Sequence, residues 1–324
     1  MQMNNAPRIA AFLGVKDEVG LIEAAILHLR AIGVDHIIAC DISSTDGTGE
    51  ILDAYRSRNF EVLTLPDEAI GSRINEPDGW FAQAKRMYEK APADWVMFLD
   101  ADEFWLPATG NIKDCIAQTT ADVLTVNRYN VVLGPHGPCV PGEMRPDSFD
   151  RILLFADRVA KMQLALQADE NIPWIRGQVG PKILARINRI EGVTAGQHAA
   201  ISDHPDLRRA KPSDLIIAHV GLSTLSRFER KLQNLRQIYE REGIDFSDPD
   251  ESWKKHNVAW HWRRWATLHD FDAEFRKNML RSEEIDDLRW EGVIQSAGQI
   301  LSGLDDQSSR NEVRVSGSIQ KSIS

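Results

Sequence analysis

Short apolar runs alternate with amphipathic stretches over the N-terminal third of the chain. The apolar runs cover residues 9–15, 36–40, 60–65 and 95–99, and the stretches between them repeat apolar side chains every three or four residues. Such runs are typical of buried strands, and such stretches are typical of helices. Because strands that are apolar throughout need cover on both faces, the alternation predicts a doubly wound α/β domain with a mostly parallel sheet.

The pattern also places the remaining elements. We predict helices at residues 19–33, 48–58 and 79–91, and a further strand at residues 215–218. Residues 130–150 are rich in Pro and Gly, which predicts a long loop.

A long helix is predicted from Ser226, because Ser226 and Glu229 have the spacing of a capping box. Its apolar stripe consists of Phe228, Leu232, Leu235 and Ile238. We therefore expect an α/β domain at 8–225 and a C-terminal helical extension at 226–302. The last residues, 303–324, are polar with few aromatic side chains, which predicts a disordered tail.

Three polar clusters follow the ends of predicted strands. They lie at residues 16–18, 41–46 and 100–103. The carboxyl ends of parallel strands meet at one edge of a sheet, and ligands of such sheets bind there. We therefore expect the three clusters to share one rim.

The third cluster concentrates negative charge. Asp100, Asp102 and Glu103 place three carboxylates within four residues, directly after a buried strand. Their mutual repulsion raises their pKa values unless a cation is present. Mg²⁺ and Mn²⁺ prefer oxygen ligands and keep positions open for substrate phosphates. The cluster therefore predicts a divalent metal site that stabilises charge on a departing nucleoside diphosphate. The alternative is a solvated acidic loop, with Asp102 capping the next helix.

Composition narrows the range of partners. A net charge of −10 argues against a general nucleic-acid binder, because phosphate neutralisation needs a basic surface. Cys40, Cys115 and Cys139 form no CxxC pair, and we expect free thiols in a reducing cytoplasm. The sequence shows neither an apolar leader at residues 1–8 nor an apolar stretch long enough for a membrane span.

The chain resembles glycosyltransferase family 2, in its bacterial branch with a DxDEF motif. The resemblance is carried by KDE at 16–18, Glu23, His28, GVDHI at 33–37, DISSTDGT at 41–48, the helix around Gln83 to Tyr88, and DWVMFLDADEFW at 94–105. It implies a GT-A fold, a nucleotide-sugar donor that we expect to be UDP-linked, a glycan or other hydroxyl acceptor, and an inverting transfer of the kind used in polysaccharide biosynthesis.

The resemblance also implies roles for residues on the rim. Asp41 resembles the residue that contacts the nucleobase, and Asp46 with Gly47 resembles the turn beside the nucleotide. Asp100 and Asp102 resemble the metal-binding DxD pair, with Asp102 the direct ligand. Lys16 and Glu18 belong to the donor-binding KDE segment, in which Asp17 stands where Asn is common, as Ile42 does after Asp41.

Later residues supply further candidates. AHVGLSTLSRFERK resembles the family's later His segment, which makes His219 a candidate third metal ligand, since imidazole is an acceptable ligand of Mn²⁺. If residues 215–218 join the parallel sheet, His219 emerges on the same rim as Asp102. Lys182 in GQVGPKILAR resembles the family's Gly-Lys segment and could offset diphosphate charge, or else be a solvated surface lysine. His198 has a weaker claim of the same kind.

An inverting transfer also needs a carboxylate base. Asp150, Asp169 and Glu170 lie in the right part of the chain, and their spacing selects none of them.

Four tryptophans crowd into residues 253–265 among basic side chains. We expect a helix that packs them on the core. The same composition also suits sugar stacking or peripheral contact with a membrane.

Three other functions fit parts of the sequence pattern less well. A phosphatase of the haloacid dehalogenase type would use Asp100 as nucleophile with Mg²⁺, but Glu103 and Phe104 follow its DxD here and three strand-helix units precede it. A non-catalytic glycan-binding relative would be expected to lose the acidic cluster. A dinucleotide oxidoreductase would need GxGxxG where KDEVG follows the first strand.

Overall fold

The computed structural model describes residues 6–69, 73–89, 93–117, 119–245 and 268–304. Its first half contains, in chain order, β1 Ile9–Val15, α1 Ile22–Ala31, β2 His36–Ile42, α2 Thr48–Ala54, β3 Phe60–Leu65, α3 Trp80–Tyr88, β4 Trp95–Asp100, β5 Glu103–Pro107, α4 Ile112–Ala117, β6 Val123–Val126, β7 Arg128–Asn130, β8 Leu133–Gly134, β9 Gly137–Pro138 and β10 Leu153–Phe155. The second half contains α5 Met162–Ala168, β11 Lys182–Ala185, β12 Gly192–Val193, β13 Ala200–Ile201, β14 Arg209–Ala210, β15 Leu215–His219, α6 Leu225–Arg241, α8 Phe271–Lys277, α9 Ser282–Trp290 and β16 Ile294–Ser296.

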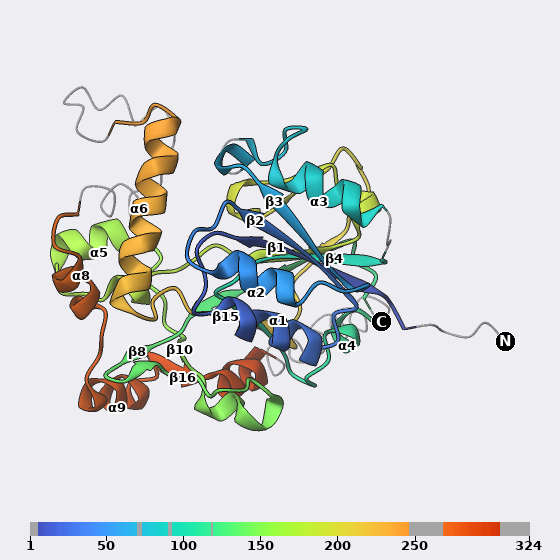
Figure 1. Cartoon of the computed structure of the whole chain (residues 1–324). Helices are drawn as coiled ribbons and strands as arrows, with labels where there is room; N and C mark the ends of the chain where they lie inside the picture. Colours follow the sequence, from blue (N-terminus) through green and yellow to red (C-terminus); the bar gives the residue numbers. More distant parts are fainter. Residues whose placement is uncertain (1–5, 70–72, 90–92, 118, 246–267, 305–324) are drawn as a thin grey trace, which may run out of the picture.

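A seven-stranded sheet forms the centre, in the order β14-β6-β11-β4-β1-β2-β3 (Figure 1). Strands β3, β2, β1 and β4 are parallel, and β6 and β14 run in their direction, whereas β11 is antiparallel to both of its neighbours. The α/β class with a mostly parallel sheet is therefore confirmed.

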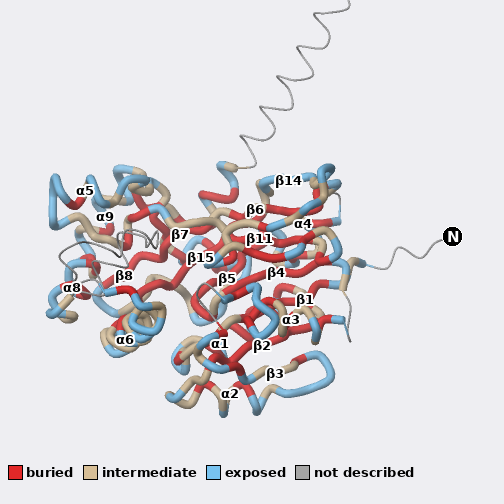
Figure 2. Tube along the Cα trace, turned by 90° about the horizontal axis from the view of Figure 1, so that it is seen from above, coloured by how far each residue is buried: buried red, intermediate tan, exposed pale blue. Residues whose placement is uncertain are grey.

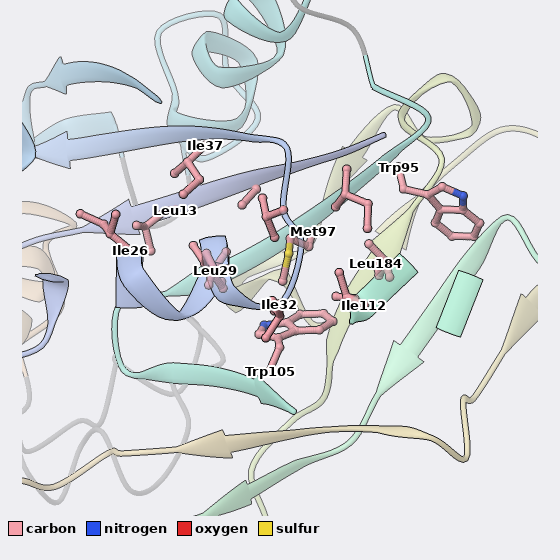
Figure 3. Close-up of a cluster of buried hydrophobic side chains, with 14 of the residues drawn as sticks. Leu13, Ile26, Leu29, Ile32, Ile37, Trp95, Met97, Trp105, Ile112 and Leu184 are labelled. Atoms are coloured by element: carbon pink, nitrogen blue, oxygen red, sulfur yellow. The ribbon is translucent and has the colours of Figure 1, made fainter. Parts of the chain in front are cut away.

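Helices cover both faces of the parallel half. On one face, α1, α2 and α4 pack on alternate side chains of β1 and β4, and Figure 3 shows Ile26 and Leu29 of α1 beside Leu13 and Met97. On the other face, α3 packs its aromatic side chains on Phe12. The side chains of β1 are buried on both faces because helices cover both (Figure 2).

The predicted strand at 215–218 exists as β15, but it joins a different sheet. A separate three-stranded sheet has the order β5-β15-β7, with β15 antiparallel to β5 and parallel to β7. The premise that β15 extends the central sheet is therefore wrong. The register pairs His219 with Glu103, so the end of β15 still lies beside the acidic cluster.

The long loop predicted at 130–150 contains some regular structure that the sequence pattern did not predict. This segment holds the short β8–β9 hairpin and a 3-10 helix at Pro146–Arg151. Apolar residues there, Val131, Val132, Leu133 and Phe149, are buried in two core clusters, which gives the segment a fixed place despite its Pro and Gly content.

The predicted helix after residue 225 is confirmed as α6, with a different cap. Thr224 is the N-cap, and its hydroxyl accepts a hydrogen bond from the backbone N–H of Arg227. The capping box expected at Ser226 is therefore wrong by two residues. Figure 1 shows α6 standing across the end of the sheet that lies opposite the N-terminus. The boundaries 8–225 and 226–302 stay predictions, and most of 303–324 lies outside the described residues.

Two further expectations concern the chain as a whole. Cys40, Cys115 and Cys139 are free thiols, as predicted. Within the part of the chain that the structure describes, no helix has the length and apolar character needed to cross a membrane.

Candidate active site

The polar loops after β1, β2 and β4 share one rim, as the strand pattern predicts. Lys16 follows β1, and its ammonium donates to the carbonyl of Ile42, 3.1 Å away, and to Asp67, 2.7 Å away. The Asp17 carboxylate accepts from the backbone N–H of Thr45 at 2.7 Å. The loops after β1 and β2 are thus tied directly to each other.

Backbone strain is concentrated at this rim. Within the described residues, the non-glycine residues with positive φ are Asp17, Ser43 and Gln197, with φ between 51° and 54°. Asp17 and Ser43 lie in the first two rim loops, and the side chain of Gln197 accepts from Lys182 at 2.5 Å. Left-handed backbone at a non-glycine residue is costly and collects at functional sites. Asp tolerates this conformation better than most residues, which fits its presence at position 17.

Asp41 and Asp46 shape the loop after β2. Asp41 is buried, and one oxygen of its carboxylate accepts a hydrogen bond from the backbone N–H of Ser44 at 3.1 Å. Asp46 accepts from Thr48 and from the backbone N–H of Val19, and it pairs with Arg230 at 2.6 Å. Burial raises the pKa of Asp46, but these hydrogen bonds and the Arg230 charge outweigh it and leave the pKa below its usual value.

Gly47 connects this loop to α2. Its φ is 99°, a left-handed conformation that favours glycine, and it is the N-cap of α2. The predicted turn at Asp46 and Gly47 therefore has the local geometry that its residues require.

Lys182 is an internal counter-ion of the acidic cluster rather than a solvated surface lysine. Its side chain is fully buried, and its ammonium lies 2.8 Å from Asp100, 3.3 Å from Glu103 and 2.5 Å from the Gln197 side-chain oxygen. Burial raises the pKa of Asp100, but the charge and hydrogen bond of Lys182, together with the charge of Arg128, outweigh it and leave the pKa below its usual value. Asp100 keeps its side chain 46% exposed, so it stays accessible to a ligand.

Glu103 is the structural member of the acidic cluster. Its side chain is fully buried and pairs with Arg128 and Lys182, and it also accepts from the backbone N–H of Asp100 at 3.0 Å. With both oxygens engaged inside the protein, Glu103 orients its neighbours and does not face the open side of the rim.

Asp102 is buried among positive groups supplied by α6. Its Oδ2 atom lies 2.8 Å from Nη2 of Arg227 and 2.7 Å from Nζ of Lys231. Burial would raise the pKa of Asp102, but the neighbouring positive charges, with that of Lys231 the largest, outweigh it and hold the pKa well below its usual range. Asp102 is therefore a carboxylate anion at neutral pH.

His219 presents an unprotonated nitrogen to Asp102. The side-chain N–H groups of Asn130 donate to the carbonyls of Ile175 and Gly177, so its Oδ1 faces Nδ1 of His219 at 2.6 Å. Nδ1 must therefore carry the proton. Burial lowers the pKa of His219 to about 4, although Asp102 raises it in part, so the ring is neutral at pH 7.

Nε2 of His219 and Oδ2 of Asp102 are therefore two electron-pair donors that face each other. Nε2 of His219 lies 3.6 Å from Oδ2 of Asp102, too far for a hydrogen bond. Neighbouring ligands of an octahedral ion lie roughly 3 Å apart when each bond is about 2.1 Å long. Carboxylate oxygen and neutral imidazole nitrogen are both acceptable to Mn²⁺, and Asp100, Asp102 and Glu103 form a cluster of possible ligand atoms within 4.8 Å of one another. The donor set at Asp102 and His219 thus fits a divalent cation.

Comparison with known families decides the class of this domain. Residues 15–136 match the family model described as glycosyl transferase family 2, and they include the rim loops after β1, β2 and β4. This segment belongs to glycosyl transferase family 2. The match confirms the resemblance to this family over residues 15–136.

Solved structures resemble the chain only distantly. Glucosyl-3-phosphoglycerate synthase from Mycobacterium tuberculosis, in complex with Mn²⁺, UDP and glucosyl-3-phosphoglycerate, is 15% identical over 74% of this chain and 82% of its own, with a TM-score of 0.33. A structure described as a mycobacterial protein is 16% identical over 74% and 76% of the two chains, with a TM-score of 0.34. At such scores no residue role can be transferred. No curated protein sequence matches the chain.

The sequence analysis did not single out the polar face of α6. Arg227 pairs with both oxygens of Glu18 at 2.6 and 2.7 Å, and Asn234 donates to Asp17 at 2.8 Å. With Arg230 and Lys231, these residues have helical spacing and lie on the face beside the rim. The sequence shows these polar residues as a second stripe next to the apolar stripe of the helix. It does not show which carboxylates they pair with.

The three candidates for the catalytic base lie away from the acidic cluster. Asp150 pairs with the Ser296 hydroxyl at 3.2 Å, and Asp169 accepts from the backbone N–H of Asn171. Glu170 is exposed. In the described residues, none of the three has a recorded contact with the acidic cluster, and the base stays a prediction.

The two remaining candidates from the sequence are His198 and the tryptophan-rich segment 253–265. Nδ1 of His198 donates to the carbonyl of Pro181 at 2.8 Å, next to Lys182 in the sequence, and burial lowers the pKa of His198. The tryptophan-rich segment 253–265 lies outside the described residues.

Proposed function

We propose that this family 2 domain transfers a sugar from a UDP-linked donor to a hydroxyl group of a glycan or another acceptor, with inversion, assisted by Mn²⁺ or Mg²⁺. The single observation that supports it best is the position of Nε2 of His219, 3.6 Å from Oδ2 of Asp102, while Nδ1 of the same ring is engaged by Asn130. A carboxylate oxygen and an imidazole nitrogen are both acceptable ligands of Mn²⁺. A reaction in the cytoplasm, as part of polysaccharide biosynthesis, is consistent with this proposal.

Each rim residue has a proposed part. Asp102 and His219 would hold the metal directly, with Asp100 beside them on the open side. A divalent ion bound there stabilises negative charge on the departing nucleoside diphosphate. Glu103 and Lys182 fix the position of Asp100 from within the protein, and Gly221, where any side chain would collide with the imidazole at 2.9 Å, leaves room for the His219 ring.

The nucleoside would lie along the loops after β1 and β2. Asp41 is proposed to contact the nucleobase, while Lys16 and Glu18 keep the first loop in place through their pairs with Asp67 and Arg227. The Asp46–Gly47 turn closes the second loop at the start of α2. Asp150, Asp169 and Glu170 remain the proposed base candidates.

The decisive experiment measures how Mn²⁺ changes the affinity for nucleotides. Binding of UDP and of a panel of nucleotide sugars is measured with and without Mn²⁺, in the wild-type protein and in His219→Ala. Mn²⁺ should strengthen UDP binding to the wild type. The variant should lose most of this gain and keep its metal-free UDP affinity, because a lost ligand acts through the cation.

A matched control is His136→Ala, which removes an exposed histidine of the β8–β9 hairpin. It should keep the full Mn²⁺ effect. A wild-type protein whose UDP affinity is the same with and without Mn²⁺ would refute the metal-assisted mechanism, and Asp102→Asn with undiminished Mn²⁺ dependence would refute the ligand assignment.

A further inference from the structure

One carboxylate oxygen carries two positive groups at the proposed metal site. Oδ2 of Asp102 accepts from Nη2 of Arg227 at 2.8 Å and from Nζ of Lys231 at 2.7 Å, while Nε2 of His219 lies 3.6 Å away. A carboxylate oxygen has about two lone-pair sites. Both are occupied by protein cations, so a metal that binds this oxygen must displace one of them.

Arg227 is fixed in its position. Its side chain is 7% exposed, and its Nε and Nη2 atoms bind the two oxygens of Glu18. Its Nη1 atom donates to the carbonyls of Val220 and Gly221, each 3.1 Å away. With the bond to Asp102, all five N–H groups of the guanidinium are used, and moving it would leave the largely buried carboxylate of Glu18, 13% exposed, without its partner.

Lys231 is held much less firmly. Its side chain is 30% exposed, and among the described residues Asp102 is the one acceptor recorded for its ammonium. Lysine is a compact charge on a flexible stem with strongly hydrated donors, so its head group can move toward solvent while its backbone stays in α6. Of the two cations, Lys231 is therefore the one that can leave.

We propose that Lys231 is an exchangeable counter-ion that occupies Asp102 Oδ2 until the metal binds and then pairs with the donor diphosphate. The inference rests on the proposed function. An ammonium and a divalent ion that shared one oxygen would repel strongly, so metal binding expels Lys231. Its anchor on α6, one turn beyond Arg227, keeps the freed charge on the rim where a metal-bound diphosphate lies.

This exchange couples the metal to the diphosphate. Without a nucleotide, the metal must expel an ammonium that gains no new partner, so it binds weakly. With a diphosphate present, the displaced Lys231 regains an anion, so each ligand strengthens binding of the other. Loss of Lys231 should therefore change the two affinities in opposite directions, whereas a purely structural role would weaken both or neither.

The test uses the full chain and the variant Lys231→Met, which keeps the length of the stem and removes the charge. Mn²⁺ affinity without nucleotide is measured by electron paramagnetic resonance of free Mn²⁺, and UDP affinity at saturating Mn²⁺ by calorimetry. We expect Mn²⁺ to bind the variant about tenfold more tightly, and UDP with Mn²⁺ to bind it about tenfold more weakly.

Arg230→Met is the matched control for the metal measurement. This substitution also removes one positive charge from α6, but Arg230 pairs with Asp46 and not with Asp102. Its Mn²⁺ affinity without nucleotide should stay within about twofold of the wild type, because the exchange acts through direct contact.

The outcomes separate this inference from the proposed function. If the wild type shows Mn²⁺-dependent UDP binding and Lys231→Met binds Mn²⁺ no more tightly, the exchange is overturned while the function stands. Unchanged UDP affinity of the variant at saturating Mn²⁺ overturns the transfer of Lys231 to the diphosphate. A wild type without any Mn²⁺-dependent UDP binding overturns the function and the exchange together.

Discussion

Nδ1 of His219 lies 2.6 Å from Oδ1 of Asn130, its register partner on the neighbouring strand β7. The other end of the Asn130 amide is fixed by two backbone carbonyls, so the contact determines which nitrogen of the imidazole carries the proton. A residue outside the acidic cluster thus fixes the imidazole in the orientation that the proposed role of His219 as a metal ligand needs.

Asn130→Leu should weaken Mn²⁺ affinity by about 10- to 100-fold, because the imidazole loses the partner that fixes its tautomer and orientation. Asn130→Asp is the matched variant, since it keeps an oxygen acceptor for Nδ1. It should retain more of the affinity than Asn130→Leu does. Mn²⁺ titration of both proteins, with melting temperatures to confirm folding, checks the point, and equal affinities in the two variants would contradict it.

Glu103→Gln should lower the free energy of unfolding by about 3–5 kcal/mol, since it leaves Arg128 and Lys182 short of a buried negative charge. Urea denaturation followed by circular dichroism measures the change. Glu76→Gln, at an exposed position, should stay within about 0.5 kcal/mol of the wild type. A Glu103 variant as stable as this control would show that the buried pairs do not support the site.

Asp41→Ala should weaken UDP and UMP binding by a similar factor of about 10 or more, because a hydrogen bond from the nucleobase to a carboxylate is lost. The two ligands share the base and differ in the diphosphate, so an effect on the base acts equally on both. Calorimetry with each nucleotide decides the matter. A loss confined to UDP would place Asp41 at the diphosphate instead.

The stability of the protein should rise with pH between about 4 and 6.5, in part through His28. Burial lowers the pKa of His28 to about 4, and its Nε2 atom donates to the carbonyl of Trp105 at 2.7 Å. Because the folded-state pKa lies below the unfolded value, the unfolded chain binds more protons in this window. His28 then contributes about 3 kcal/mol above pH 6.5, which is lost as the pH falls to 4.

His28→Gln isolates this contribution. Its unfolding free energy, measured in urea at pH 4, 5, 6 and 7, should fall less steeply with decreasing pH than that of the wild type, since carboxylates titrate alike in both proteins. Parallel curves for the two proteins would show that His28 is not the source.

The sequence determined the parallel half of the fold by itself. Strands β1 to β4 and the helices between them were predicted from the apolar runs and amphipathic stretches, because burial on both faces leaves a pattern that local sequence carries. It also determined that the clusters around Lys16, Asp41 and Asp100 share one rim, since the carboxyl ends of parallel strands must meet.

Only the tertiary structure decided the chemistry of that rim. His219 reaches Asp102 through the register of β15 on β5, not through the central sheet, and strand pairing over more than a hundred residues leaves no local mark on the sequence. The same holds for Arg227 and Lys231. The sequence predicts their positions on α6, but their pairing with Asp102 depends on where the helix packs. Side-chain types and periodicity are local properties, whereas the pairing of charges depends on contacts that only folding brings together.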